Sequence, residues 1–207
     1  MATYAVIQPH QFTYNGQVIF KASPGKEESF FLEAYRFFKA DYPKFHKMDL
    51  FCQMGFLSAW PIVPKHRLMA PEKTGVLLAS KSGSSYIDQN YYEKVFANAD
   101  ISYSPAQFTY TLPSAILGEL SIKHNFQGEN YFFLQASEHL DLLRDYAKSL
   151  FKSNRLEACL LGWMDYYDEA HFQSCYAWIE AEDLKDLDNI IFNINKNRLD
   201  YGKAPIN

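Results

Sequence analysis

The stretch TGVLLAS, residues 74–80, constrains the fold more than any other part of the sequence. Its interior is continuously apolar, whereas a strand with one wet face would alternate apolar and polar residues. A continuous run of this kind is typical of a strand that is covered on both faces, as strands between two layers of helices are. The sequence therefore predicts a sheet with a buried strand at residues 74–80.

Helix and strand patterns alternate on both sides of this run, which indicates a layered α/β fold with helices on both faces of a mixed sheet, in one domain over residues 1–207. A turn signal at Asn15 and Gly16 predicts a hairpin within 4–20. Further strands are expected at 131–134, 157–167 and 172–182, helices at 30–38, 47–60, 86–97 and 112–126, a loop around Pro105, and a short helix or loose tail at the end.

Composition excludes several classes of partner. The chain is 48% hydrophobic and 17% aromatic, enough for a large core or a sizeable partner interface. A net charge of −4 without a Lys/Arg run argues against binding of nucleic acid or anionic lipid. No apolar stretch approaches the ~18 to 20 residues that span a bilayer, and MATYAVIQPHQ lacks the features of a signal peptide. We expect a cytoplasmic protein that does not insert into membranes.

No cofactor or metal is predicted. The three cysteines, Cys52, Cys159 and Cys175, are widely spaced in apolar surroundings and are interpreted as core residues. The histidines are scattered without the spacing of a zinc site. SKSGSS, residues 80–85, lacks the glycine spacing and terminal Lys-Ser/Thr of a phosphate-binding loop, so it is interpreted as a tight turn.

A strand, a sharp turn and a helix follow one another in GENYFFLQASEHLDLLRDY, residues 128–146. The apolar positions of the predicted helix are Leu140, Leu143, Tyr146, Ala147, Leu150 and Phe151. Ser137 stands at the turn, where enzymes often place a nucleophile, but a serine there is also a good helix N-cap worth ~1 kcal/mol. Ser137, Glu138 and His139 do not form a catalytic triad, because adjacent helical side chains point in different directions.

Five stretches taken in order resemble the N-terminal half of β-ketoacyl synthases, the condensing enzymes with the thiolase fold. They are KMDLFCQ (47–53), TGVLLASKSGSS (74–85), SPAQFTYTLPSAILGELSIKHNFQGEN (104–130), FFLQAS (132–137) and LEACLLGWMDYY (156–167). The resemblance covers about residues 45–170, and it is strongest to short, half-length ketosynthase-like proteins of aryl polyene and flexirubin-type pigment clusters. It implies a thiolase-like fold for this chain.

The resemblance also implies lost catalysis. In the family the nucleophilic Cys stands nine residues after a Gly, and counting from Gly128 leads to Ser137. A thiol can be made a thiolate by a helix N-terminus, whereas a serine hydroxyl needs an adjacent base. Family enzymes add two histidines, or a histidine and an asparagine, from a C-terminal half that these 207 residues do not contain. We therefore expect no condensing site from this chain alone.

Chain-length factors, the inactive partners of ketosynthases, supply the functional expectation. Alignment on Gly83 and Lys94 puts Ser85, Asp88 and Tyr92 at positions that gate the partner's acyl channel, with Tyr86 beside them. The alternative is that Tyr92 packs on the core, as aromatic residues at helical spacing usually do. The strand of Tyr131, Phe132, Phe133 and Leu134 corresponds to the family's dimer interface.

The resemblance thus implies an inactive subunit that pairs with a full-length ketosynthase and shapes its acyl channel in fatty-acid or polyketide-type biosynthesis. An acyl carrier protein would deliver substrate through the partner. Two alternatives stay open: a stand-alone acyltransferase or thioesterase that uses Ser137, and a homodimeric acyl-binding scaffold.

Overall fold

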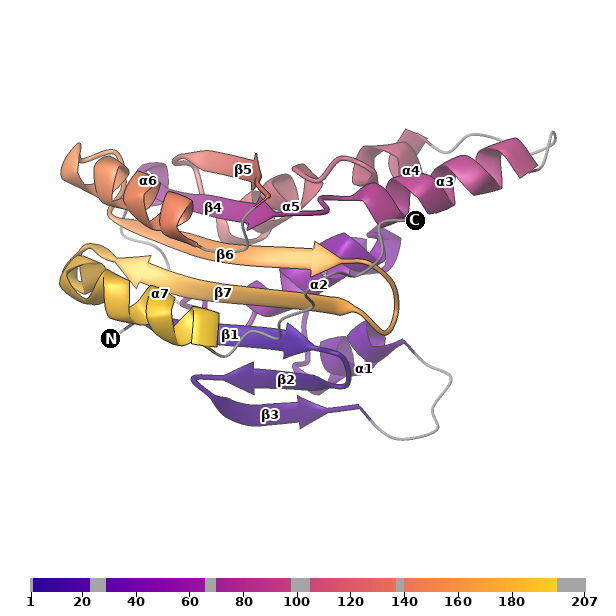
Figure 1. The fold of residues 1–207 in the computed structure, drawn as a ribbon, viewed down its shortest axis with the longest axis horizontal. Helices are drawn as coiled ribbons and strands as arrows, with labels where there is room; N and C mark the ends of the chain where they lie inside the picture. Colours follow the sequence, from indigo (N-terminus) through magenta and orange to yellow (C-terminus); the bar gives the residue numbers. More distant parts are fainter. Residues whose placement is uncertain (1, 23–28, 66–69, 98–104, 137–139, 197–207) are drawn as a thin grey trace.

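The computed structural model describes residues 2–22, 29–65, 70–97, 105–136 and 140–196. The strands of this part form one seven-stranded sheet in the order β3-β2-β1-β7-β6-β4-β5 (Figure 1). Their bounds are β1 Thr3–Gln8, β2 Gln11–Tyr14, β3 Gln17–Lys21, β4 Thr74–Ser80, β5 Asn130–Leu134, β6 Ala158–Tyr166 and β7 Phe172–Glu180. β7 runs antiparallel to both β1 and β6, whereas β6, β4 and β5 are parallel to one another. The sheet is therefore mixed, as predicted.

Helices cover both faces of the sheet, so the predicted layered α/β fold is confirmed (Figure 1). All seven residues of β4 are buried, and they alternate between the two cores: Val76 and Leu78 face one, Leu77 and Ala79 the other. The first core is closed by α1 (Phe30–Phe37), α2 (Leu50–Ala59) and α5 (Ala115–His124), the second by α6 (Asp141–Lys152) and α7 (Leu187–Lys196). The continuous apolar run was a reliable signal because neither face of β4 meets water.

Two helices extend beyond the end of the sheet. α3 (Ser85–Ala97) follows the turn after β4, and α4 (Pro105–Tyr110) lies beside it, as Figure 1 shows at the upper right. We call this pair the α3–α4 arm. Short 3₁₀ helices at Pro43–Lys47, Pro71–Lys73 and Ala181–Asp186 complete the described elements.

Of the two turn and loop predictions, the hairpin is confirmed and the loop around Pro105 is not. The hairpin is confirmed between β2 and β3, where Asn15 and Gly16 adopt φ values of +47° and +78°, the left-handed conformation that a two-residue turn requires. The loop expected around Pro105 is wrong, because Pro105 is the first residue of α4. Proline fits that position since its missing N–H has no helical partner there in any case.

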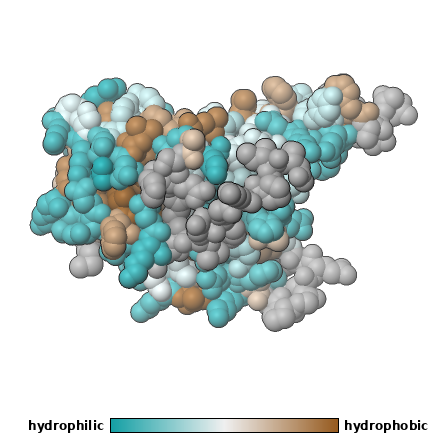
Figure 2. Space-filling view, viewed as in Figure 1, coloured by the Kyte–Doolittle hydropathy of each residue, from teal (hydrophilic) through white to brown (hydrophobic). Residues whose placement is uncertain are grey.

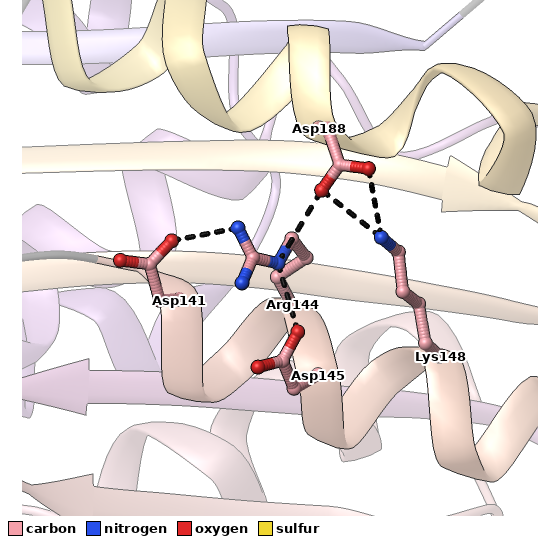
Figure 3. Close-up of polar contacts among 5 residues, drawn as sticks. All are labelled: Asp141, Arg144, Asp145, Lys148 and Asp188. Carbon is pink, nitrogen blue, oxygen red and sulfur yellow. Dashed lines mark hydrogen bonds and ion pairs between the residues drawn. The ribbon is translucent and has the colours of Figure 1, made fainter.

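The outer surface of α6 and α7 is charged. Arg144 on α6 pairs with Asp141 at 2.8 Å and Asp145 at 2.9 Å on its own helix, and it reaches Asp188 on α7 at 3.4 Å (Figure 3). Lys148 pairs with the same Asp188 at 2.9 Å. Exposed ion pairs of this kind contribute little to stability, but these pairs link the two helices of this layer across a polar surface.

Within the described residues, no helix combines the length and the apolar character that crossing a membrane requires.

Candidate functional site

β5 is an edge of the sheet. Among the described strands it pairs with β4 alone, in parallel register from Val76 opposite Asn130 to Ser80 opposite Leu134. The Val76 N–H donates to the Glu129 carbonyl at 2.9 Å, and the Gln135 N–H donates to the Ser80 carbonyl at 3.0 Å. In a parallel ladder, alternate residues bond to the neighbouring strand.

The register decides which backbone groups of β5 are left over. Its odd-numbered residues bond to β4, so the N–H and C=O groups of Asn130, Phe132 and Leu134 point away from the sheet. No residue of the described ranges bonds to these outward groups. An edge of this kind is a template for a further strand.

The side chains of β5 divide between the two cores and the surface. Tyr131 and Phe133 pack edge-on against Tyr146 of α6, with ring centroids 5.1 and 5.5 Å apart. Phe132 faces the opposite core. Leu134 is 64% exposed. Of the four predicted interface residues, three are thus partly covered by their own chain and only Leu134 stands mostly free.

One end of β5 carries a polar cluster. Glu129 forms an ion pair with Arg155, and hydrogen bonds with Tyr146 and Glu129 raise the pKa of Tyr131 to about 12. The Tyr131 phenol is therefore a neutral hydrogen-bonding group at physiological pH. The edge runs from this polar end to the apolar Leu134, and Figure 2 shows hydrophobic side chains along this side of the molecule and on the arm.

The turn at 80–85 is built around a buried carboxylate that the sequence analysis did not identify. Asp165 near the end of β6 is 1% exposed. Its Oδ1 accepts from the Ser80 hydroxyl at 2.7 Å, the Ser82 hydroxyl at 2.8 Å, and the backbone N–H groups of Ser82 and Lys81 at 2.9 and 3.0 Å. Its Oδ2 accepts from Trp163 Nε1 at 2.7 Å. A lone acid in the apolar stretch LLGWMDYY was the available signal, since a buried charge needs partners.

The predicted gating residues fall into two groups. Ser85 and Tyr86 belong to the base of the arm: the Ser85 hydroxyl donates to the Ser82 carbonyl at 2.5 Å, and the Tyr86 ring lies 5.5 Å from the ring of Tyr166. Tyr86 packs against the core. Neither side chain lines the groove described next.

Asp88 and Tyr92 line a groove of about 580 Å³ along the arm. Phe96 of α3 and Phe108 of α4 share this groove, and the ring of Tyr92 packs at a tilt of 33° against that of Phe96, with centroids 4.2 Å apart. Tyr92 is 60% exposed and Phe96 69%. The alternative that Tyr92 packs on the core is therefore wrong, and its exposed aromatic surface is available to another molecule.

Asp49 lies close enough to Asp88 for the two carboxylates to repel each other. Its Oδ1 caps α2 by accepting from the Cys52 N–H at 2.6 Å, while its Oδ2 is buried and has no hydrogen-bond partner among the residues that the structure describes. Burial raises the pKa of Asp49 to about 6, the bond to Cys52 opposes this change, and the charge of Asp88 adds to it. A carboxylate with such a pKa is a candidate for pH-dependent behaviour near the base of the arm.

Ser137 lies outside the described residues, and its role as an altered nucleophile stays a prediction. Its role as a helix N-cap likewise stays a prediction; the described part of α6 begins at Asp141, with Leu140 at the N-cap position. The predicted apolar face of this helix is confirmed, with Leu143, Ala147 and Leu150 buried. The periodicity located the face because it repeats over three turns, but it did not locate the start.

The cysteine prediction is confirmed, because Cys52, Cys159 and Cys175 are all buried thiols that form no disulfide with one another. Burial raises the pKa of the Cys52 and Cys159 thiols, so neither is a nucleophile near neutral pH. Among the described residues, no three His, Cys, Asp or Glu side chains come together as metal ligands.

The fold is that of ketosynthase and chain length factor structures, a thiolase-like layered α/β fold, so the expectation drawn from the five sequence stretches is confirmed. The ishigamide ketosynthase/chain length factor aligns with a TM-score of 0.63 at 15% identity, over 88% of this chain and 62% of that chain. A ketosynthase in complex with its chain length factor from Xenorhabdus doucetiae aligns at 0.57 and 9% identity, over 86% of this chain and 76% of that one.

A third structure, a type II polyketide synthase acyl-carrier protein in complex with its ketosynthase, aligns with a TM-score of 0.55 at 14% identity, over 71% of this chain and 51% of that chain. The present chain thus spans about three fifths of the length of the ishigamide protein. No family model and no curated protein matches the sequence.

Proposed function

We propose that this protein is a catalytically inactive ketosynthase-like subunit that pairs with an active ketosynthase and shapes its acyl channel, as a chain-length factor does. The observation that carries the proposal is the open edge of β5, whose end meets the turn from which the arm starts. Leu134 at the end of β5 lies against Gly83, in the turn from which α3 starts. One partner could therefore cover the edge and receive the arm at the same time.

The pairing follows from the chemistry of the edge. A strand from a ketosynthase would satisfy the outward N–H and C=O groups of Asn130, Phe132 and Leu134, and it would cover the exposed Leu134 side chain. Stable partners of this kind commonly bury ~2,000 Å² or more, with aromatic residues near the centre.

The absence of a covalent step is proposed from Ser137. A hydroxyl in the position of the family's Cys cannot become a thiolate and needs a base, and the sequence around Ser137 shows no catalytic triad. The partner would contribute the Cys and the histidines, and an acyl carrier protein would bring substrate to it. A fatty-acid or polyketide-type pathway such as aryl polyene synthesis is the setting that the resemblance supports.

The groove supports the channel-shaping part of the proposal. Tyr92, Phe96 and Phe108 present aromatic surface that can contact an apolar acyl chain, and Asp88 sets one polar limit. Replacing Tyr92 by Ala would lengthen the space available beside the acyl chain. We expect the complex carrying Tyr92→Ala to make a different distribution of product lengths, measured by mass spectrometry of the released acyl chains.

The pairing is tested by placing one carboxylate at the edge. Leu134→Asp should separate the protein from a coexpressed ketosynthase on size-exclusion chromatography, because the new charge would be buried without a partner. Phe192→Asp on α7 is the matched control, since Phe192 is 67% exposed, close to the 64% of Leu134, and α7 is not the helix that packs on β5. Phe133→Asp is a poorer test because Phe133 packs on Tyr146.

The alternatives give different results in the same experiment. A homodimeric scaffold would elute as a dimer without any ketosynthase and be split by Leu134→Asp. An acyltransferase or thioesterase would turn over an acyl thioester alone and lose that activity in Ser137→Ala. If Leu134→Asp leaves the ketosynthase complex intact, the proposed edge pairing is wrong.

A further inference from the structure

The buried carboxylate of Asp165 receives all but one of its hydrogen bonds from a single turn. The donors on Oδ1 are two hydroxyls and two consecutive backbone N–H groups from Ser80, Lys81 and Ser82, which lead from β4 towards α3. Two consecutive amides held by one oxygen fix the direction in which the chain leaves the strand. Hydrogen bonds to a buried charge are also stronger than bonds between neutral groups.

The next residues transmit this constraint to α3. The Gly83 N–H donates to the Ser80 hydroxyl at 2.7 Å, and Gly83 adopts a φ of +57°, which lets the chain reverse. The Ser85 N–H and hydroxyl both donate to the Ser82 carbonyl, at 3.2 and 2.5 Å. Hydrogen bonds thus lead from Asp165 through Ser80 to Gly83, and through Ser82 to Ser85, the first residue of α3.

The turn that leads into α3 is also hydrogen-bonded to the end of α4. The hydroxyl of Ser84 donates to the carbonyl of Thr111, the residue that follows α4. Tyr166, directly after Asp165 on β6, packs its ring against the ring of Tyr86. Two adjacent residues of one strand therefore contact the base of the arm, whereas Tyr92 and Phe96 farther along α3 are mostly exposed.

A small rotation of the first turn of α3 produces a large displacement at the far end of the α3–α4 arm. α3 has 13 residues, which at 1.5 Å per residue makes it about 20 Å long. A rotation of roughly 10° at its first turn would move its far end by about 3 Å and Tyr92 by about 2 Å, by the same helical geometry. Shifts of this size alter the space that a groove leaves for an acyl chain.

We infer that Asp165 is a positioning residue: its carboxylate fixes the angle at which the α3–α4 arm leaves the sheet, and so places the groove of Tyr92, Phe96 and Phe108. The anchoring is a property of this chain alone. Its consequence for product length rests on the function proposed above.

The test compares Asp165→Asn with Asp183→Asn, a matched control. Asp183 is also buried, and it caps the 3₁₀ helix at Ala181–Asp186. Hydrogen exchange followed by mass spectrometry on the isolated protein reports the opening of 84–97. We expect Asp165→Asn to raise exchange there by about tenfold or more, and Asp183→Asn to leave it unchanged. Ser82→Ala, which removes one donor and keeps the backbone bonds, should give a smaller increase at the same amides.

Two results would overturn the inference: unchanged exchange at 84–97 in a folded Asp165→Asn protein, or, if that variant does not fold, unchanged exchange in Ser82→Ala. The ketosynthase complex provides the second readout, and Asp165→Asn should shift product length in the same assay as Tyr92→Ala. Faster exchange without a product shift in either variant would uphold the anchoring and refute the channel-shaping function.

Discussion

Asp49→Asn should make the protein more stable at neutral pH. The pKa of Asp49 rises from 3.8 to about 6 on folding, because burial disfavours its charged form and Asp88 repels it. A displacement of this size corresponds to about 3 kcal/mol between the two protonation states. Asparagine is as good an N-cap as aspartate, so the substitution keeps the bond from the Cys52 N–H and removes the charge, while its NH2 takes the place of the unpartnered Oδ2, which lowers the expected gain below the full 3 kcal/mol.

The pH at which the difference appears follows from the sign of the pKa change. Below pH 4 Asp49 is protonated in both the folded and the unfolded protein and costs nothing. Between pH 4 and 6 the unfolded chain loses its proton first, so the stability contributed by the protonated carboxyl is lost as the pH rises. Above pH 6 the full penalty applies. We therefore expect the free energy of unfolding of the Asp49→Asn protein to exceed that of the natural protein by about 1 to 3 kcal/mol at pH 7, and to match it at pH 4.

Urea unfolding of both proteins at several values between pH 4 and 8 measures this difference. Taking the difference at each pH removes the contributions of all other groups, provided that their pKa values are the same in both proteins. Asp49→Ala is the control for the cap and should be less stable than Asp49→Asn at every pH by about 1 kcal/mol. A difference between Asn and Asp that does not change with pH, or one that grows as the pH falls, would refute the reasoning.

The remaining predictions concern other residues. Burial lowers the pKa of His124 from 6.5 to about 4, so stability should be lost as the pH falls from 6.5 to 4, and urea unfolding of His124→Phe should show less of this loss. Ser137→Ala should leave product formation by a ketosynthase complex unchanged, and an activity lost with the fold intact would restore Ser137 as a nucleophile. The isolated protein should form no β-ketoacyl product from malonyl carrier and an acyl thioester, and product above a boiled control would contradict this.

The histidine and the aspartate affect stability in opposite directions. Between pH 4 and 6 the Asp49 contribution falls with rising pH, whereas the His124 contribution rises. The two slopes partly cancel in the natural protein, so a flat stability profile there would not argue against either pKa. Only the paired variants separate them.

Much of the architecture was determined by local patterns in the sequence. The apolar run at 74–80, the Asn15–Gly16 turn and the helical period from Leu143 to Phe151 each describe a short segment whose burial depends on its own residues. Such patterns persist in the fold because a misplaced apolar face would lose its burial. The five stretches that resemble β-ketoacyl synthases, taken in order, predicted the thiolase-like fold correctly.

The tertiary structure alone decided which residues meet. Asp165 was one acid among many in the sequence, and its role became visible only when β6 came to lie beside β4 and placed it under the turn at 80–82. The order of strands likewise made β5 an edge, which divided its bulky side chains between α6, the opposite core and the surface. Contacts between residues 85 positions apart leave no periodic signal, because they depend on how whole elements pack.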